Sequence, residues 1–279
     1  MKFSTVLHNN TQRFGLVEGE DIYLAPEGQT LKSAVSGDLS ALAKDLRSVR
    51  AVPLDQVQFA PVIPDPDQIF CTGLNYQHHR DETRPEHRKA YPEHPVIFMR
   101  FASSLSGHGA SVIKPHNSDV VDYEGELAVI IGKPGRYLTA ENAMSHVAGV
   151  ACFNDVSMRD WQMKGEQWGP GKNFPTTGPF GPYMVTLDET GPLEDLELRT
   201  LLDGVVMQKS KLDFLIFDIP TVIAYCSQFC ELRSGDVIVT GTPGGVGFTR
   251  KPMILLEPGK TVVVEIDRVG RLENTIVAE

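Results

Sequence analysis

The sequence predicts a β-rich α+β fold with a small strand-and-helix unit at the N-terminal side. Two observations lead to this class: strand candidates outnumber helix candidates, and the two kinds of element do not alternate regularly. A doubly wound parallel sheet needs that alternation, so the pattern disfavours it. The chain also shows no internal repeat, heptad pattern or low-complexity tract.

The first 65 residues differ from the rest of the chain and predict a small N-terminal α/β domain. Short strands separated by polar turns are expected at residues 3–7, 13–17 and 21–25. Apolar residues at helical spacing then predict a helix within residues 30–49. Prolines that suit a connector rather than a helix or a central strand follow at Pro61, Pro64 and Pro66. We therefore predict two domains, residues 1–65 and 66–279.

The second domain reads mostly as strands separated by glycine and proline turns. Strands are expected at residues 96–100, 126–132, 148–154, 183–186, 237–241, 261–266 and 271–277. The clearest helix is expected at residues 220–231, where Pro220 suits the first turn. A shorter helix is expected at residues 139–144.

Composition narrows the class of protein. A chain of 279 residues can bury a core without disulfides or a structural metal. Its net charge of −10 disfavours binding to nucleic acid or to an anionic membrane. The sequence has neither an apolar stretch near the ~20 residues that span a bilayer nor a signal peptide, so a cytoplasmic location is expected. The cysteines are expected to be core thiols rather than metal ligands: Cys71, Cys152, Cys226 and Cys230.

Three acidic residues suggest a metal site. Glu124 and Glu126 are two residues apart at the start of an apolar strand, so both side chains face the same way. Their charges repel one another, and a cation would turn that repulsion into binding. Asp155 ends a second apolar strand and can complete the set. Oxygen ligands without matching His or Cys favour Mg²⁺, with Mn²⁺ or Ca²⁺ as alternatives, over Zn²⁺. The alternative is an exposed strand end with the acids in water and Asp155 in a turn or cap.

Lys172 and a His–Glu pair are candidates for catalysis. Lys172 lies among small residues and proline, where an ammonium near a metal can stabilise an oxyanion. His79 and Glu82 are three residues apart and share a face of one helical turn. The carboxylate can orient the imidazole as a general base. The alternatives are an exposed loop lysine and a polar surface segment.

Residues 240–247 form a glycine-rich loop after a strand. The loop lacks the Gly-Lys-Ser/Thr ending of a P-loop, which makes nucleotide binding improbable. Its backbone N–H groups and the Thr242 hydroxyl can still approach a small anion. A tight loop without a ligand is equally compatible with the pattern.

Five segments, in this order, resemble the fumarylacetoacetate hydrolase family: GLNYQHHRDET, DYEGELAVIIGK, FNDVSMRDWQ, GKNFPTTGPFGP and SGDVIVTGTPGGVG. The resemblance runs from about residue 67 to the C-terminus. It implies a mixed β-sandwich roll, usually dimeric, behind a small N-terminal domain. Two departures from the family pattern, Pro175 and the charged residues 83–94, are expected to affect substrate selection.

The resemblance also implies roles for individual residues. Glu124, Glu126 and Asp155 would ligate a divalent metal. His79 and Glu82 would lie on a segment that orders over bound substrate and activates water. Contacts to the substrate and to an oxyanion are implied for Lys172, Arg159 and Gln162, and a contact to a carboxylate for Thr242.

The function expected from these residues is Mg²⁺-dependent hydrolysis of a C–C bond in a 2,4-dioxo acid such as an acylpyruvate, within aromatic catabolism. The partners would be a small 2-oxo acid and a second copy of the chain. One alternative keeps the site and changes the reaction to tautomerisation, isomerisation or decarboxylation of a 2-oxo diacid, for example oxaloacetate or a hydroxymuconate-type acid. Another is a metal-stabilised binding module without turnover, which the combination of His79, Glu82 and Lys172 disfavours.

Overall fold

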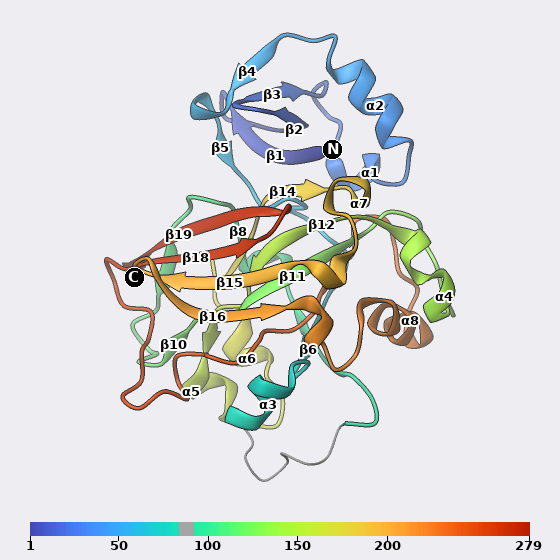
Figure 1. Ribbon diagram of the computed structural model, residues 1–279. Helices are drawn as coiled ribbons and strands as arrows, with labels where there is room; N and C mark the ends of the chain where they lie inside the picture. Colours follow the sequence, from blue (N-terminus) through green and yellow to red (C-terminus); the bar gives the residue numbers. More distant parts are fainter. Residues whose placement is uncertain (84–91) are drawn as a thin grey trace.

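The structure is a computed structural model, and it describes residues 1–83 and 92–279. It confirms the β-rich α+β class (Figure 1). The described strands form one long sheet, a second sheet of five strands and a small pair. The long sheet has the order β4-β3-β2-β1-β14-β12-β11-β17-β6-β7, with β5 beside β1 and β8 beside β14.

The strands of the long sheet are β1 Lys2–His8, β2 Thr11–Glu18, β3 Asp21–Leu24, β4 Ala51–Pro53, β5 Gln58–Phe59, β6 Ile69–Gly73, β7 Val96–Arg100, β8 Leu105–Ser106, β11 Gly125–Ile131, β12 Val147–Asn154, β14 Gly178–Val185 and β17 Val237–Val239. The second sheet contains β9 Val112–Lys114, β15 Glu197–Leu202, β16 Val205–Lys211, β18 Thr261–Ile266 and β19 Gly270–Ala278. The small pair is β10 Val121–Asp122 with β13 Ser157–Met158. The helices are α1 Leu31–Ala34, α2 Leu39–Leu46, α3 Gln77–Thr83, α4 Ala140–Ala143, α5 Arg159–Gln162, α6 Gly169–Lys172, α7 Leu187–Thr190 and α8 Ile219–Phe229.

The predicted strands all have counterparts in the structure, but two details of the prediction were wrong. Residues 30–49 form two helices instead of one, because the chain turns at Gly37 and Asp38 caps the start of α2 by accepting the N–H of Ser40 and Ala41. The hairpin of β15 and β16 is also absent from the prediction. Its turn, Asp203–Gly204, has positive φ at both residues, as a tight hairpin turn requires.

Strand β11 lies at the centre of the molecule and positions the site. The second sheet packs over β11 and its neighbour β12, as the orange and red strands in Figure 1 show. Leu127, Val129 and Ile131 face that sheet, whereas Ala128 and Ile130 pack in the core on the opposite face. Both faces are covered, which explains why this strand is apolar throughout after its first acid.

The first five strands and the first two helices lie together at one end of the molecule (Figure 1). Hydrogen bonds join β1 to β14, with Phe3 opposite Met184, so this unit extends the long sheet. Phe3 also belongs to the same apolar core as Phe153 in β12. The division into domains at residues 64–66 stays a prediction.

Three further points bear on expectations from the sequence. The cysteines are unpaired thiols, with Cys71, Cys152 and Cys226 buried and Cys230 partly exposed. Among the described helices, none has the length and apolar character needed to cross a bilayer. Most of the charged segment 83–94 lies outside the described residues.

Candidate active site

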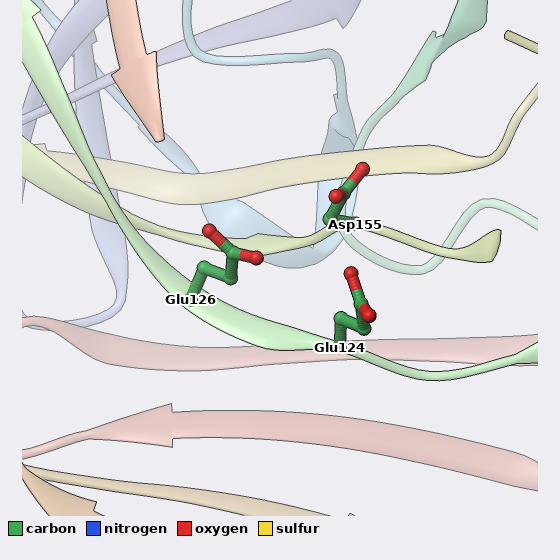
Figure 2. A group of neighbouring side chains, drawn as sticks. All are labelled: Glu124, Glu126 and Asp155. Atoms are coloured by element: carbon green, nitrogen blue, oxygen red, sulfur yellow. The ribbon is translucent and has the colours of Figure 1, made fainter. Parts of the chain in front are cut away.

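Three carboxylates converge where β11 begins and β12 ends. The Asp155 N–H donates to the Glu124 carbonyl at 2.8 Å, which ties the two strand ends together. Glu126 is two residues further along and points to the same side as Glu124. Oxygens of Glu124, Glu126 and Asp155 all lie within 4.8 Å of one another. Figure 2 shows the three side chains gathered around one space.

All three acids are buried: Glu124, Glu126 and Asp155 are 4%, 2% and 0% exposed. The alternative of an exposed strand end is therefore wrong. Three like charges in a low-dielectric site repel strongly unless cations compensate them. The protein supplies part of that compensation itself.

Lys172, at the end of α6, is only 1% exposed and reaches into this cluster. Its Nζ donates to Glu124 Oε2 at 2.6 Å and to Asp155 Oδ2 at 2.5 Å. Burial by itself would lower the pKa of Lys172, but Asp155 and Glu124 outweigh it and raise that pKa. Lys172 is therefore a fixed cation at the site, and the alternative of an exposed loop lysine is wrong.

Arg159 supplies a second buried cation from the start of α5. Its Nη2 lies 2.5 Å from Glu124 Oε1, and its Nη1 donates to Gln162 Oε1 at 2.9 Å. Burial opposes ionisation of Glu124, but Arg159, Lys172 and His79 together hold the pKa of Glu124 well below its usual range. Glu124 is thus ionised and bound from two sides.

Glu126 differs from Glu124 in its surroundings. Its carboxylate accepts the Gly241 N–H at 2.5 Å. Burial raises the pKa of Glu126, and the neighbouring charges of Asp155 and Glu124 raise it further. Lys172 and Arg159 bind Glu124 and Asp155, so the negative charge of the cluster is least compensated at Glu126.

The residues fit a divalent cation. All three candidate ligands offer oxygen, which hard cations such as Mg²⁺, Mn²⁺ and Ca²⁺ prefer. The Lys172 ammonium between Glu124 and Asp155 shows that positive charge is stable at this position. The ligand roles of the three acids and the identity of the ion stay predictions.

His79 lies in α3 with its ring between two carboxylates. Nδ1 is 3.0 Å from Glu82 Oε1, and Nε2 is 3.9 Å from Glu124 Oε1. The predicted sharing of a helix face by His79 and Glu82 is thus confirmed. His79 is 4% exposed, so the pair is part of the site and not a polar surface segment.

The glycine-rich loop at residues 240–248 uses its N–H groups differently from the expectation. The Gly241 N–H donates to the Glu126 carboxylate, as described above. The Gly245 N–H donates to both oxygens of Glu82 at 3.1 and 2.9 Å. The Thr242 hydroxyl donates to the Gly125 carbonyl and accepts from the Gln208 amide. These groups hold the chain's own carboxylates and strands. A contact from Thr242 to a substrate carboxylate stays a prediction.

Seven of the nine predicted site residues line one cavity of about 130 Å³, whereas Glu82 and Asp155 are not part of its lining. Its polar lining includes His79, Glu124, Glu126, Arg159, Gln162, Lys172 and Thr242. Apolar side chains also line this cavity, namely Leu74, Phe98, Met163, Trp168 and Phe248. Pro175 lies outside it, in a neighbouring groove with Phe174, so its effect on substrate selection stays a prediction.

Two buried charged residues at the site were missed as site residues. Arg100, at the end of β7, forms an ion pair with Asp155 and donates to Thr177 Oγ1 at 2.7 Å. Asp122 binds Arg159 through Oδ2 at 3.0 and 2.9 Å. Asp122 is two residues before Glu124, so the alternation of strand side chains could have indicated that it lies near the site. Nothing in the local sequence around Arg100 indicates its partner.

Buried acids held by buried cations, beside a histidine oriented by glutamate, form an arrangement typical of an enzyme active site. The family model "Fumarylacetoacetate (FAA) hydrolase C-terminal" matches residues 68–277. The chain therefore belongs to the fumarylacetoacetate hydrolase family, as the sequence segments implied.

Known relatives and solved structures agree with this assignment. The chain is 42% identical over 229 residues to bovine "Oxaloacetate tautomerase FAHD2A, mitochondrial", with 81% of this chain and 71% of the relative covered. It matches a 5-carboxymethyl-2-hydroxymuconate delta-isomerase from Mycobacterium smegmatis with a TM-score of 0.81, 30% identity and full coverage of both chains. It matches a fumarylacetoacetate hydrolase from Exiguobacterium antarcticum with a TM-score of 0.84, 31% identity and full coverage of both chains.

Proposed function

We propose that this protein is a divalent-metal-dependent tautomerase of a small 2-oxo dicarboxylic acid, with oxaloacetate as the first substrate to test. The relatives named as oxaloacetate tautomerases and the structures named as isomerases support this alternative better than the C–C hydrolase first expected. The structural observation that supports proton transfer at this site is the position of His79. Its Nε2 faces the acidic cluster while Glu82 holds Nδ1.

Tautomerisation moves one proton from C3 of the 2-oxo acid to the keto oxygen and changes no other atom's partners. From keto to enol, His79 Nε2 takes the C3 proton and Glu82 stabilises the imidazolium that forms. The imidazolium then gives the proton to the enolate oxygen, and the enol-to-keto direction runs the same two transfers in reverse. The Lys172 ammonium stabilises negative charge that develops on the keto oxygen. Arg159 and Gln162 bind the adjacent carboxylate. A divalent cation bound by Glu124, Glu126 and Asp155 would supply Lewis acidity at the same oxygens.

The cavity suits a compact acid. At about 130 Å³ it is smaller than the roughly 300–1,000 Å³ typical of pockets for drug-sized ligands. Its lining includes charged and polar side chains to which carboxylate and keto oxygens would bind.

Hydrolysis of an acylpyruvate is the second candidate, and the same pair supports it. His79 oriented by Glu82 can also deprotonate water for attack on a distal carbonyl. The similarity to a structure named fumarylacetoacetate hydrolase favours keeping this reaction in the test.

One experiment separates the two candidates. Purified protein is stripped with EDTA, reloaded with Mg²⁺, and assayed by ultraviolet absorbance with enol oxaloacetate and with a panel of acylpyruvates. We expect Mg²⁺-dependent enol-to-keto conversion faster than the buffer rate, and little loss of the 2,4-dioxo absorbance. Acylpyruvate cleavage without oxaloacetate conversion would overturn the proposal in favour of the hydrolase.

The homodimer and the cytoplasmic location also belong to the proposal. Light scattering coupled to size-exclusion chromatography tests the first, with a mass near twice that of the 30.7 kDa chain expected. Fractionation of the source cells tests the second.

A further inference from the structure

Asp122 is a fully buried carboxylate beside the site, at the end of β10. Its Oδ1 accepts the N–H of Gly247 at 2.7 Å and of Tyr123 at 2.9 Å. Its Oδ2 accepts the N–H of Phe248 at 3.2 Å and is bound by Arg159 Nε and Nη2. With both oxygens engaged by donors, Asp122 has no lone pair directed at the acidic cluster and does not act as a further metal ligand.

These contacts fix the Arg159 guanidinium along one edge and on one face. Asp122 binds its Nε and Nη2, and the Phe248 ring lies with its centroid 4.4 Å from the guanidinium carbon. The remaining interactions of the guanidinium point into the site, toward Glu124 and Gln162. The pairing of β10 with β13 brings Asp122 alongside Arg159, since Val121 lies opposite Met158.

The glycine-rich loop in turn fixes Asp122. A Cβ at Gly247 would lie 2.6 Å from Asp122 Oδ1 and 1.9 Å from the Ile254 carbonyl oxygen, so only glycine permits this approach. The same loop holds Glu82 through the Gly245 N–H. One loop therefore anchors two carboxylates.

We infer that Asp122 is a positioning residue for this reaction: held by the loop at Gly247 and Phe248, it orients Arg159 against Glu124 and against the carboxylate of the substrate. Glu82 does the same for His79 on the other side. Arg159 Nη2 and His79 Nε2 both face the same atom, Glu124 Oε1. The loop thus aligns the two charged groups that flank this oxygen. The inference rests on the proposed substrate contact of Arg159.

A double-mutant cycle tests the inference. Asp122→Asn, Arg159→Met and the double variant are compared for binding of oxalate, a planar dicarboxylate that resembles the enolised 2-oxo acid, by calorimetry with Mg²⁺. Asp122→Asn should weaken oxalate binding about tenfold and lower kcat/KM for oxaloacetate about 10²-fold. In the Arg159→Met background, Asp122→Asn should change neither quantity by more than about twofold, because Asp122 acts through Arg159.

Two controls keep the test decisive. Asp236→Asn removes a matched buried carboxylate that accepts the N–H of Gln68 and Arg233 away from the site. It should lower the melting temperature and leave oxalate binding unchanged. Mn²⁺ affinity, measured by electron paramagnetic resonance, should stay within about threefold in Asp122→Asn, because the three candidate ligands remain.

If Asp122→Asn does not fold, Asp122→Glu replaces it in the cycle, since it keeps the charge and displaces the carboxylate from its contacts with Arg159. Independent effects of the two substitutions on oxalate binding would overturn the inference, as would wild-type binding in Asp122→Asn. Another outcome is that the cycle shows this coupling in oxalate binding while the wild-type protein does not convert oxaloacetate. That result would contradict the proposed function and leave the role of Asp122 intact.

Discussion

The Lys172 ammonium lies 2.6 Å from Glu124 Oε2, and both groups are almost completely buried. A lysine in such a place has lost its hydration and is stabilised by the acids around it. In the proposed reaction, the same ammonium would stabilise the negative charge that develops during enolisation. Because its position is already fixed by the acids, this stabilisation would need little solvent reorganisation, which is the basis of electrostatic catalysis.

The first prediction follows from this contact. Lys172→Met should lower kcat by about 10²–10³, because the side chain keeps its length and loses its charge. The fold should remain, with a lower melting temperature in EDTA, since Glu124 and Asp155 lose their shared cation. Lys209→Met is the control: Lys209 is exposed on β16, and its loss should change neither quantity. Normal activity of Lys172→Met in the steady-state assay would remove Lys172 from the mechanism.

The second prediction concerns Arg100, which is buried against Asp155. Arg100→Met leaves a buried carboxylate without one of its cations and should lower the free energy of unfolding by about 3–5 kcal/mol. Arg100→Lys should recover part of this loss because it keeps the charge. Arg271→Met is the matched control, since Arg271 forms surface ion pairs with Glu265 and Glu273. Its loss should cost no more than about 1 kcal/mol. Urea denaturation measures all three, and equal losses for Arg100 and Arg271 would contradict the prediction.

Arg100 also shows which contacts could not be predicted from local sequence patterns. Local patterns were sufficient for β11, whose apolar run and leading acids predict both a buried strand and a shared face. They were also sufficient for His79 and Glu82, because a helical turn alone brings residues three apart together. The pair of Arg100 and Asp155 joins residues 55 apart in the chain, and only the sheet topology brings them into contact.

For the glycine-rich loop, too, the sequence predicts the kind of interaction but not the partner. Its composition predicts backbone N–H groups that approach an anion, and the structure contains such approaches. The anions are Glu82, Asp122 and Glu126 of the chain itself. A glycine pattern specifies backbone freedom, whereas the partner depends on which distant strand the loop faces.

The third prediction links pH to the metal through Glu126. Its pKa in the metal-free protein is raised by burial and then by Asp155 and Glu124. The folded protein therefore binds a proton more tightly than the unfolded chain. The stability that this proton contributes is present at low pH and is lost as pH rises through the raised pKa. Metal binding needs the carboxylate, so it releases the proton and grows stronger over the same range.

We therefore expect the increase in melting temperature caused by Mg²⁺ to grow as the pH rises above the usual pKa range of a glutamate and through the raised pKa of Glu126. Glu126→Gln mimics the protonated side chain. It should make the metal-free melting temperature less sensitive to pH and remove most of the increase caused by Mg²⁺. Glu257→Gln, at a partly exposed ion pair with Lys114, should behave as wild type. An undiminished Mg²⁺ effect in Glu126→Gln, measured by scanning fluorimetry, would show that Glu126 is not a ligand.

The last prediction decides which chemistry His79 performs. If His79 is the base for C3, His79→Ala should lower oxaloacetate tautomerisation by about 10²–10⁴. Glu82→Gln should lower it less, because glutamine keeps an acceptor for the ring N–H and for Gly245 but loses the charge that supports an imidazolium. Mn²⁺ binding should survive in both variants, since neither residue is proposed as a ligand.

His78→Ala is the matched control, because His78 is the exposed neighbour of His79 on α3 and its ring packs beside Phe214. It should convert oxaloacetate at the wild-type rate. The decisive comparison measures both reactions in His79→Ala. Loss of acylpyruvate cleavage with unchanged tautomerisation would assign His79 to water activation and restore the hydrolase. Loss of tautomerisation in a protein that never cleaves acylpyruvates would identify His79 as the proton-transfer group, because enolisation needs a base at C3 and no water at all.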